Sequence, residues 1–180
     1  MTRLARNISL ALALMLAAQR APGQAAPDPV ASAVRAAAAQ LSRNLVAAAD
    51  DMPASKYPFK PTPAQMTVSE VVLHLAGDNE FSCSAIGATK APEEPRLTPD
   101  DSVPKLIARL KRSFAFCNAV LAKLGDSGLG EMVPGFGAGQ VTRAAMIFEI
   151  HEDWADHYSQ LANYLRLNGI LPPTARRRPS

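Results

Sequence analysis

The sequence predicts an all-α protein, a four-helix bundle, and three observations carry this prediction. Four segments of roughly 20 residues repeat apolar residues at the three- and four-residue spacing of an amphipathic helix. Aromatic residues make up only 6% of the 180 residues, while alanine and leucine supply much of the 48% that is hydrophobic, which favours helices over strands. No segment alternates convincingly between apolar and polar residues. Packing four helices together buries their four apolar stripes.

The first 25 residues are expected to be a secretory signal peptide. Arg3 and Arg6 precede an apolar run of eleven residues, Ile8–Ala18, and small residues follow up to Ala25 and Ala26, where cleavage fits. This run is shorter than the about 20 residues that span a bilayer, which argues against a permanent anchor. We therefore expect a periplasmic or secreted protein.

The first two helices have recognisable boundaries. The first is expected to begin after Asp28, as its N-cap, and to end at Asp50–Pro53. Thr67 and Glu70 have the spacing of a capping box, in which each side chain accepts a hydrogen bond from the other residue's backbone amide. The second helix is therefore expected over Val68–Ile86.

The third and fourth helices are bounded by proline and glycine. The third is expected to carry Pro104 in its first turn and to end at Gly125. The fourth is expected over Thr142–Asn168, because Gly169 and then Pro172–Pro173 stop it.

The connections differ in composition. Met52–Pro63 is rich in proline and predicts a long surface connection, and Lys90–Val103 is a linker rich in proline and acidic residues. Gly125–Gln140 is rich in glycine, but no strand precedes it and no Lys-Ser/Thr pair follows, so it is not a phosphate-binding loop. We expect a flexible connection there.

The charge balance opposes binding to nucleic acid or anionic membranes. Removal of residues 1–25 would remove three arginines and no acidic residue, which leaves sixteen basic and sixteen acidic residues. A neutral chain lacks the electrostatic attraction that such partners require. We expect the bundle to occupy residues 28–173 and a basic flexible tail, with Arg176–Arg178, to occupy residues 174–180.

Two cysteines, Cys83 and Cys117, remain after the signal peptide. In an oxidising compartment such a pair can form a disulfide. Two buried thiols and a single reactive cysteine are the alternatives that the sequence leaves open.

The three histidines all lie on expected helices: His74 on the second, and His151 and His157 on the fourth. Because a helix turns about 100° per residue, Asp153 and His157 share one face, while His151 lies about 120° away from His157. The zinc-protease pattern needs two histidines four residues apart, so the spacing from His151 to His157 excludes it.

Apolar neighbours on the same stripe predict that Asp153 and His157 face inward. These neighbours are Met146, Ile150, Leu161 and Tyr164. Buried polar groups need partners. Two explanations remain open, a divalent cation held by His74, Asp153 and His157, or a buried Asp-His hydrogen bond with His74 satisfied separately.

Two stretches of the chain resemble the DinB/YfiT-like superfamily. One is Lys60–Thr67 followed by Val71–Ala76, and the other is Asp156–Leu161 running into Tyr164–Pro173. The match covers most of the chain after the leader, and the C-terminal stretch is its most specific part.

The resemblance implies a four-helix bundle that binds a divalent metal through three histidines, one from the second helix and a pair four residues apart on the fourth. His74 and His157 match two of these positions, and Asp153 stands at the third. Carboxylates ligate zinc, nickel, manganese and iron, so a metal site of two histidines and one aspartate remains chemically sound. Asp78 and Tyr158 are further candidates for orienting a ligand, and homodimerisation is also implied.

The leading functional hypothesis is an exported metal-dependent enzyme acting on a small molecule, as a hydrolase or a thiol-type transferase, the classes that the resemblance implies. The alternative is a non-catalytic periplasmic binding or stress-associated protein with a degraded metal site, because Asp153 replaces a histidine and no nucleophile-base pair is evident. A DNA-binding role is opposed by the neutral charge and the expected export.

Overall fold

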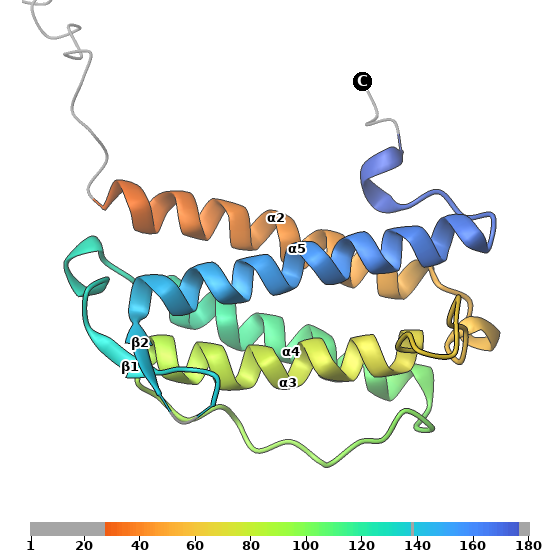
Figure 1. Ribbon diagram of the computed structural model, residues 1–180, viewed down its shortest axis with the longest axis horizontal. Helices are drawn as coiled ribbons and strands as arrows, with labels where there is room; N and C mark the ends of the chain where they lie inside the picture. Colours follow the sequence, from red (N-terminus) through yellow and green to blue (C-terminus); the bar gives the residue numbers. More distant parts are fainter. Residues whose placement is uncertain (1–27, 138, 177–180) are drawn as a thin grey trace, which may run out of the picture.

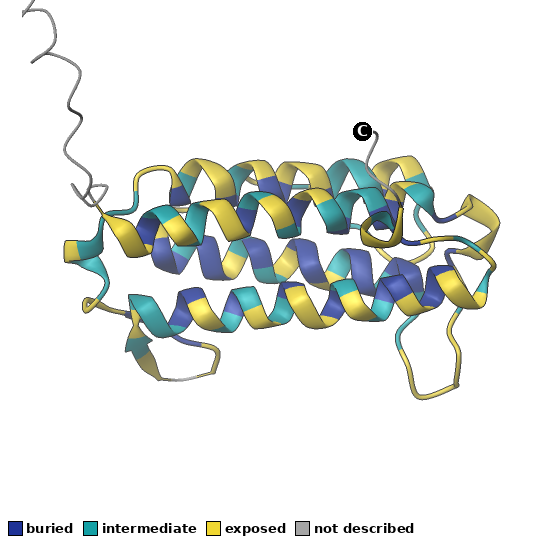
Figure 2. Cartoon of the chain, turned by 90° about the horizontal axis from the view of Figure 1, so that it is seen from above, coloured by how far each residue is buried: buried dark blue, intermediate teal, exposed yellow. Residues whose placement is uncertain are grey.

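Four long helices form a bundle in the computed structural model, which describes residues 28–137 and 139–176 (Figure 1). The helices are α2 (Pro29–Asp51), α3 (Val68–Gly87), α4 (Val103–Leu121) and α5 (Arg143–Leu167). Buried residues lie on the inward faces of the helices and exposed residues on the outward faces (Figure 2). The predicted all-α bundle is confirmed.

Helices α3 and α4 run in the same direction. Two cross-helix contacts, Asn79 with Ser113 and Cys83 with Cys117, join residues 34 positions apart. A constant separation in sequence is the mark of parallel helices, because both chains advance together. Residues 88–102 therefore return along the length of the bundle before α4 begins, and α2 and α5 run in the opposite direction (Figure 1).

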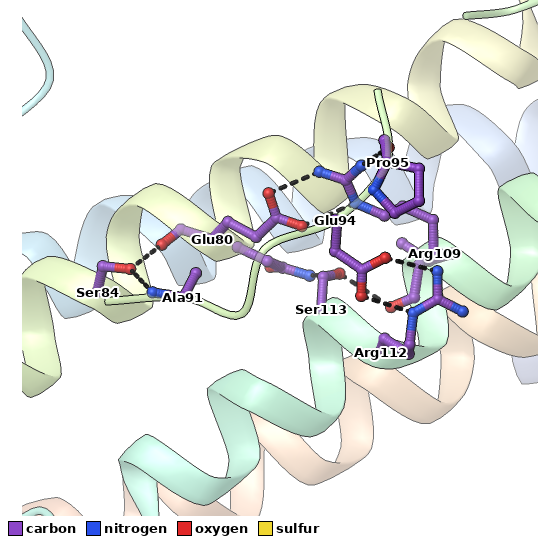
Figure 3. A network of polar contacts seen from close by, with 10 residues as sticks. Glu80, Ser84, Ala91, Glu94, Pro95, Arg109, Arg112 and Ser113 are labelled. Atoms are coloured by element: carbon purple, nitrogen blue, oxygen red, sulfur yellow. Dashed lines mark hydrogen bonds and ion pairs between the residues drawn. The ribbon is translucent and has the colours of Figure 1, made fainter. Parts of the chain in front are cut away.

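Ion pairs fasten this returning segment to the bundle (Figure 3). Arg109 of α4 donates to both carboxylate oxygens of Glu80 of α3, at 2.8 and 2.7 Å, and to the carbonyl oxygen of Pro95 at 2.9 Å. Arg112 donates to Glu94 at 2.6 and 2.7 Å. Glu94 and Asp101 of the linker thus pair with basic residues of α4, Arg112 and Lys105.

Most helix boundaries lie where the sequence predicted them. The capping box of α3 is present, since the Glu70 amide donates to Thr67 Oγ1 at 3.2 Å and the Thr67 amide donates to Glu70 Oε2 at 2.6 Å. Gly169, with a φ of 75°, follows α5 as expected. Helix α4 ends at Leu121, one turn before Gly125. Beyond it the backbone amides of Lys123 and Leu124 donate to the carbonyl oxygen three residues earlier, as in a 3-10 helix, so the α-helical pattern stops there.

The N-terminus of α2 is capped from another part of the chain. Asp28 precedes the helix as predicted, but its side chain makes no capping hydrogen bond. Instead, the carboxylate of Asp126 accepts hydrogen bonds from the amides of Val30 and Ala31 at 3.1 and 2.7 Å. Asp28 in turn accepts one from the Asp126 amide at 2.8 Å. Asp126 thus takes the capping role that the sequence suggested for Asp28.

A β-hairpin occupies part of the segment that was expected to be a flexible connection. Strands β1 (Met132–Pro134) and β2 (Gln140–Thr142) pair antiparallel, with Val133 opposite Val141. Strands of three residues are too short for an alternating pattern to reveal them, so the expectation was wrong here. The hairpin contacts α3 and α5 near the end of the bundle where α5 begins.

A polar cluster and a cysteine pair lie inside the core. The indole nitrogen of Trp154 donates to Asn79 Oδ1 at 2.6 Å, and Asn79 Nδ2 donates to Ser113 Oγ at 2.9 Å. These bonds join α5, α3 and α4. Cys83 and Cys117, both fully buried, lie at disulfide-bonding distance with their Cα atoms 5.2 Å apart. The disulfide, of the three alternatives, fits this geometry.

The predicted signal peptide, residues 1–25, lies outside the described residues. Among the described helices, none has the length and hydropathy that crossing a bilayer requires. The beginning of the expected tail contacts the bundle, because Thr174 exchanges hydrogen bonds with the Tyr158 hydroxyl and Arg176 pairs with Asp51. Residues 177–180 also lie outside the described part of the chain.

Candidate metal centre

His74, Asp153 and His157 come together where α3 packs against α5. Asp153 and His157 are stacked one turn apart on α5, with Asp153 Oδ1 3.2 Å from His157 Nε2. His74 approaches from α3, and its Nε2 lies 3.5 Å from the same carboxylate oxygen. One ligand atom from each of the three residues lies within 4.8 Å of the other two. The antiparallel course of α3 and α5 brings the two helices' side chains to one point.

One oxygen of this cluster lacks a partner. Asp153 Oδ2 is buried and accepts no hydrogen bond from any described residue. A buried carboxylate oxygen without a donor is destabilising, and a cation is one of the few groups that can satisfy it. The side chains of His157, Asp153 and His74 are 10%, 18% and 39% exposed, so the cluster is closed on the α5 side and open beside His74.

Asp78 flanks the cluster, as the sequence suggested. It lies one turn after His74 on α3, and its Oδ2 is 3.2 Å from His74 Nε2. Burial raises the pKa of Asp78, the positive charge of His74 lowers it, and the nearby Asp153 raises it further, so that the pKa stands above its ordinary value. On α5, Asp153 and His157 form a similar pair four residues apart. Each helix thus supplies one histidine and one aspartate.

His157 is held by a hydrogen bond on its outer side. Its Nδ1 lies 2.8 Å from Gln160 Oε1. Burial lowers the pKa of His157, but hydrogen bonds with Asp153 and Gln160, together with the charge of Asp153, outweigh that effect and raise the pKa above its ordinary value. A proton therefore competes with a metal ion for this side chain.

Two recesses adjoin the cluster. One, of about 450 Å³, is lined by Asp153 together with Phe136 and Val141 from the hairpin segment and three further acidic residues of α5, which are Glu149, Glu152 and Asp156. The other, of about 790 Å³, is lined by His157, Gln160 and Tyr164 and by the segment before α3. Asp156 borders both recesses. The carboxylates give this region a negative potential that attracts cations.

The remaining candidates lie elsewhere. His151 turns away, with its Nδ1 2.8 Å from the carbonyl oxygen of Ile147, as the helical geometry predicted. Trp154 is buried against the core and binds Asn79. The Tyr158 hydroxyl donates to Thr174 at 2.8 Å, outside the cluster. Tyr158 was suggested as an orienting residue, and the structure gives that position to Gln160 instead.

Sequence reasoning missed Gln160 and Asn79. Gln160 follows His157 by three residues, a spacing that places both on one helix face, and this was the only signal for it. Asn79 has no signal in the sequence, because its partners Trp154 and Ser113 come from two other helices.

The comparisons with known proteins agree with this architecture. A family model described as the DinB superfamily matches residues 37–161, which is more than half of the chain. The chain belongs to the DinB superfamily. The resemblance implied three histidines, and in this DinB protein Asp153 stands where the third was expected.

Solved structures show the same fold. A DinB-like protein from Bacillus subtilis is 21% identical, with a TM-score of 0.64 and coverage of 81% of this chain and 99% of that chain. A DinB-like protein from Bacillus cereus is 14% identical, with a TM-score of 0.64 and coverage of 79% and 95%. A conserved protein from Enterococcus faecalis is 16% identical, with a TM-score of 0.59 and coverage of 77% and 96%. No protein of curated function matches the DinB protein in sequence.

Proposed function

We propose that this DinB protein binds one divalent metal ion through His74, Asp153 and His157. The observation that carries the proposal is the buried Oδ2 of Asp153, which has no donor among the described residues although two imidazoles lie beside its carboxylate. Two nitrogen ligands and one oxygen ligand suit zinc, nickel, manganese or iron. The donor set therefore fits the metal that the family resemblance implies.

We further propose that the protein is a metal-dependent hydrolase acting on a small molecule. A divalent ion with three protein ligands keeps positions open for water or substrate and acts there as a Lewis acid. The chain's own part is to shape the space beside the ligands. The recess of about 450 Å³ next to Asp153 and the larger one beside His157 offer room for a small molecule on two sides.

Export is part of this proposal and decides between hydrolase and transferase. The basic, apolar and small-residue pattern of residues 1–25 supports a signal peptide. The pairing of Cys83 with Cys117 accords with an oxidising compartment. Low-molecular-weight thiols are scarce in such a compartment, which makes a thiol-type transferase harder to support than a hydrolase.

A non-catalytic role is the second candidate, and one observation favours it. His74 with Asp78 and His157 with Asp153 each form a close pair at 3.2 Å. If both imidazoles are protonated, the positive charge of each is balanced by its neighbouring aspartate without a metal. The protein is then a periplasmic binding or stress-associated bundle. Proton and metal are thus the two alternatives for the same cluster.

Elemental analysis of the mature protein, purified from the periplasm without chelator, distinguishes the two functions. We expect near-stoichiometric metal in the parent and its loss in His157→Ala and in Asp153→Ala. His151→Ala is the matched control, since it removes a histidine of the same helix that lies outside the cluster. The parent should also melt at a higher temperature with saturating metal than after chelation. A folded parent that stays metal-free after soaking with these four ions would leave only the non-catalytic function.

A further inference from the structure

A chain of three hydrogen bonds links His157 to the backbone before α3. His157 Nδ1 lies 2.8 Å from Gln160 Oε1, Gln160 Nε2 lies 2.8 Å from the Tyr164 hydroxyl, and that hydroxyl lies 2.8 Å from the carbonyl oxygen of Met66. Tyr164 is almost fully buried, and its ring packs edge-on against Phe59, which fixes the hydroxyl in place.

The carbonyl oxygen of Met66, at the end of this chain, determines which group donates and which accepts in each of the three hydrogen bonds. A backbone carbonyl can only accept, so the single proton of the Tyr164 hydroxyl points to Met66. The hydroxyl oxygen must then accept from Gln160, which requires the amide nitrogen of Gln160 on that side. The amide oxygen of Gln160 is left to face His157, and it can only accept.

The consequence for His157 is a defined tautomer. Because Gln160 Oε1 accepts, Nδ1 of His157 carries a hydrogen, and in the neutral ring Nε2 carries the lone pair. That nitrogen is the one that lies 3.2 Å from Asp153 Oδ1. A lone pair facing a carboxylate oxygen is repulsive unless a proton or a metal ion lies between them.

We propose that Gln160 and Tyr164 are positioning residues that fix His157 as the Nδ1–H tautomer and so present its Nε2 lone pair to Asp153 and His74. The role of this tautomer in holding a metal rests on the proposed function, but the tautomer itself does not. With Tyr164 removed, Gln160 can turn its amide group over and donate to Nδ1, which selects the tautomer that cannot bind metal through Nε2.

Long-range proton–nitrogen NMR of the metal-free protein tests the tautomer directly, at a pH above the His157 titration. We expect the Nδ1–H pattern in the parent and in Tyr158→Phe, and a mixture of tautomers in Tyr164→Phe. Tyr158→Phe is the matched control, because it removes the hydroxyl of the residue next to His157 without touching the hydrogen-bonded chain. An Nε2–H pattern in the parent would overturn the proposal.

Zinc affinity, measured by competition with a chromophoric chelator, tests the consequence. Loss of an outer partner of a metal-bound histidine typically weakens binding roughly 10–100-fold. We expect a loss in that range for Tyr164→Phe and Gln160→Leu, whereas Gln160→Glu, which still accepts from Nδ1, retains parent affinity. Folded Tyr164→Phe and Gln160→Leu proteins that bind zinc as the parent does would overturn the positioning role. A parent with the Nδ1–H pattern that binds no metal would support the tautomer and overturn the metal site instead.

Discussion

Asp153 Oδ1 lies 3.5 Å from His74 Nε2, across the contact between α5 and α3. The same oxygen lies 3.2 Å from His157 Nε2, so one carboxylate oxygen is shared by two imidazoles from different helices. A single ligand position on α5 therefore connects the two halves of the candidate site, and substitutions there are the most informative.

Asp153→Asn should weaken zinc binding by more than the roughly 10–100-fold that loss of an outer-shell partner produces, because it removes a charged ligand. Asp153→His should restore binding, since it completes the three-histidine set that the family resemblance implies. Competition titrations with a chelator measure both. Asp100→Asn is the control, because it removes one exposed carboxylate of the α3–α4 linker, outside both the ligand set and the recess beside Asp153. Equal affinities in Asp153→Asn and Asp100→Asn would contradict the site.

The cysteine pair should contribute strongly to stability. A cross-link closing a loop of this length, a sequence separation of 34 residues, is worth about 3–4 kcal/mol in the chain-entropy model, and usually less in practice. We expect reductant to lower the denaturant midpoint of the parent. The Cys83→Ala/Cys117→Ala protein should unfold at the lower midpoint with or without reductant. If reductant leaves the denaturant midpoint of the parent unchanged, under conditions in which free thiols are detected, the prediction is contradicted.

Asn79→Leu should destabilise the bundle by roughly 1–3 kcal/mol, because it leaves the buried indole N–H of Trp154 without an acceptor and removes the hydrogen bond that the Ser113 hydroxyl accepts. Urea unfolding followed by Trp154 fluorescence measures the change. Asn118→Leu serves as the control, since Asn118 is an exposed asparagine of α4. Similar free energies of unfolding for the two variants would show that the buried hydrogen bonds of Asn79 do not stabilise the bundle.

Asp126→Ala should lower the free energy of unfolding by about 1 kcal/mol, the usual effect of losing an N-cap, because the amides of Val30 and Ala31 lose their acceptor. Hydrogen exchange should accelerate in the first turn of α2 and nowhere else. Asp100→Ala, at an exposed residue of the α3–α4 linker, should leave both measurements unchanged. If Asp126→Ala behaves like this control, the remote cap is not stabilising.

The capping box of α3 should make stability depend on pH in the acid range. Hydrogen bonds from the Thr67 backbone amide and hydroxyl lower the pKa of Glu70 in the folded protein. A carboxyl group with a lowered pKa stabilises the fold above its unfolded pKa, and this contribution is lost as the pH falls through the folded pKa. Glu70→Gln should therefore lose less stability than the parent as the pH falls below the Glu reference pKa of about 4.3. The measurement is the melting temperature of each protein as a function of pH. Melting temperatures that fall equally with pH in the two proteins would contradict the prediction.

The sequence by itself determined the long helices and the three candidate ligands, His74, Asp153 and His157, but not Gln160 beside them. Apolar spacing and the capping signals at Thr67 and Glu70 depend only on neighbouring residues, so they could be predicted without tertiary information. The pairing of Asp153 with His157 on one face, and the exclusion of His151, follow from the helical turn alone.

The tertiary structure decided everything that depends on which segments become neighbours. The parallel course of α3 and α4, the cap that Asp126 gives to α2, and the bond between Asn79 and Trp154 join residues far apart in the chain. Local sequence patterns cannot predict such contacts. They depend on the direction and rotation of each helix, and the packing of the whole core sets both. The tautomer of His157 belongs to the same class, since its hydrogen-bonded chain ends on the backbone of Met66, before another helix.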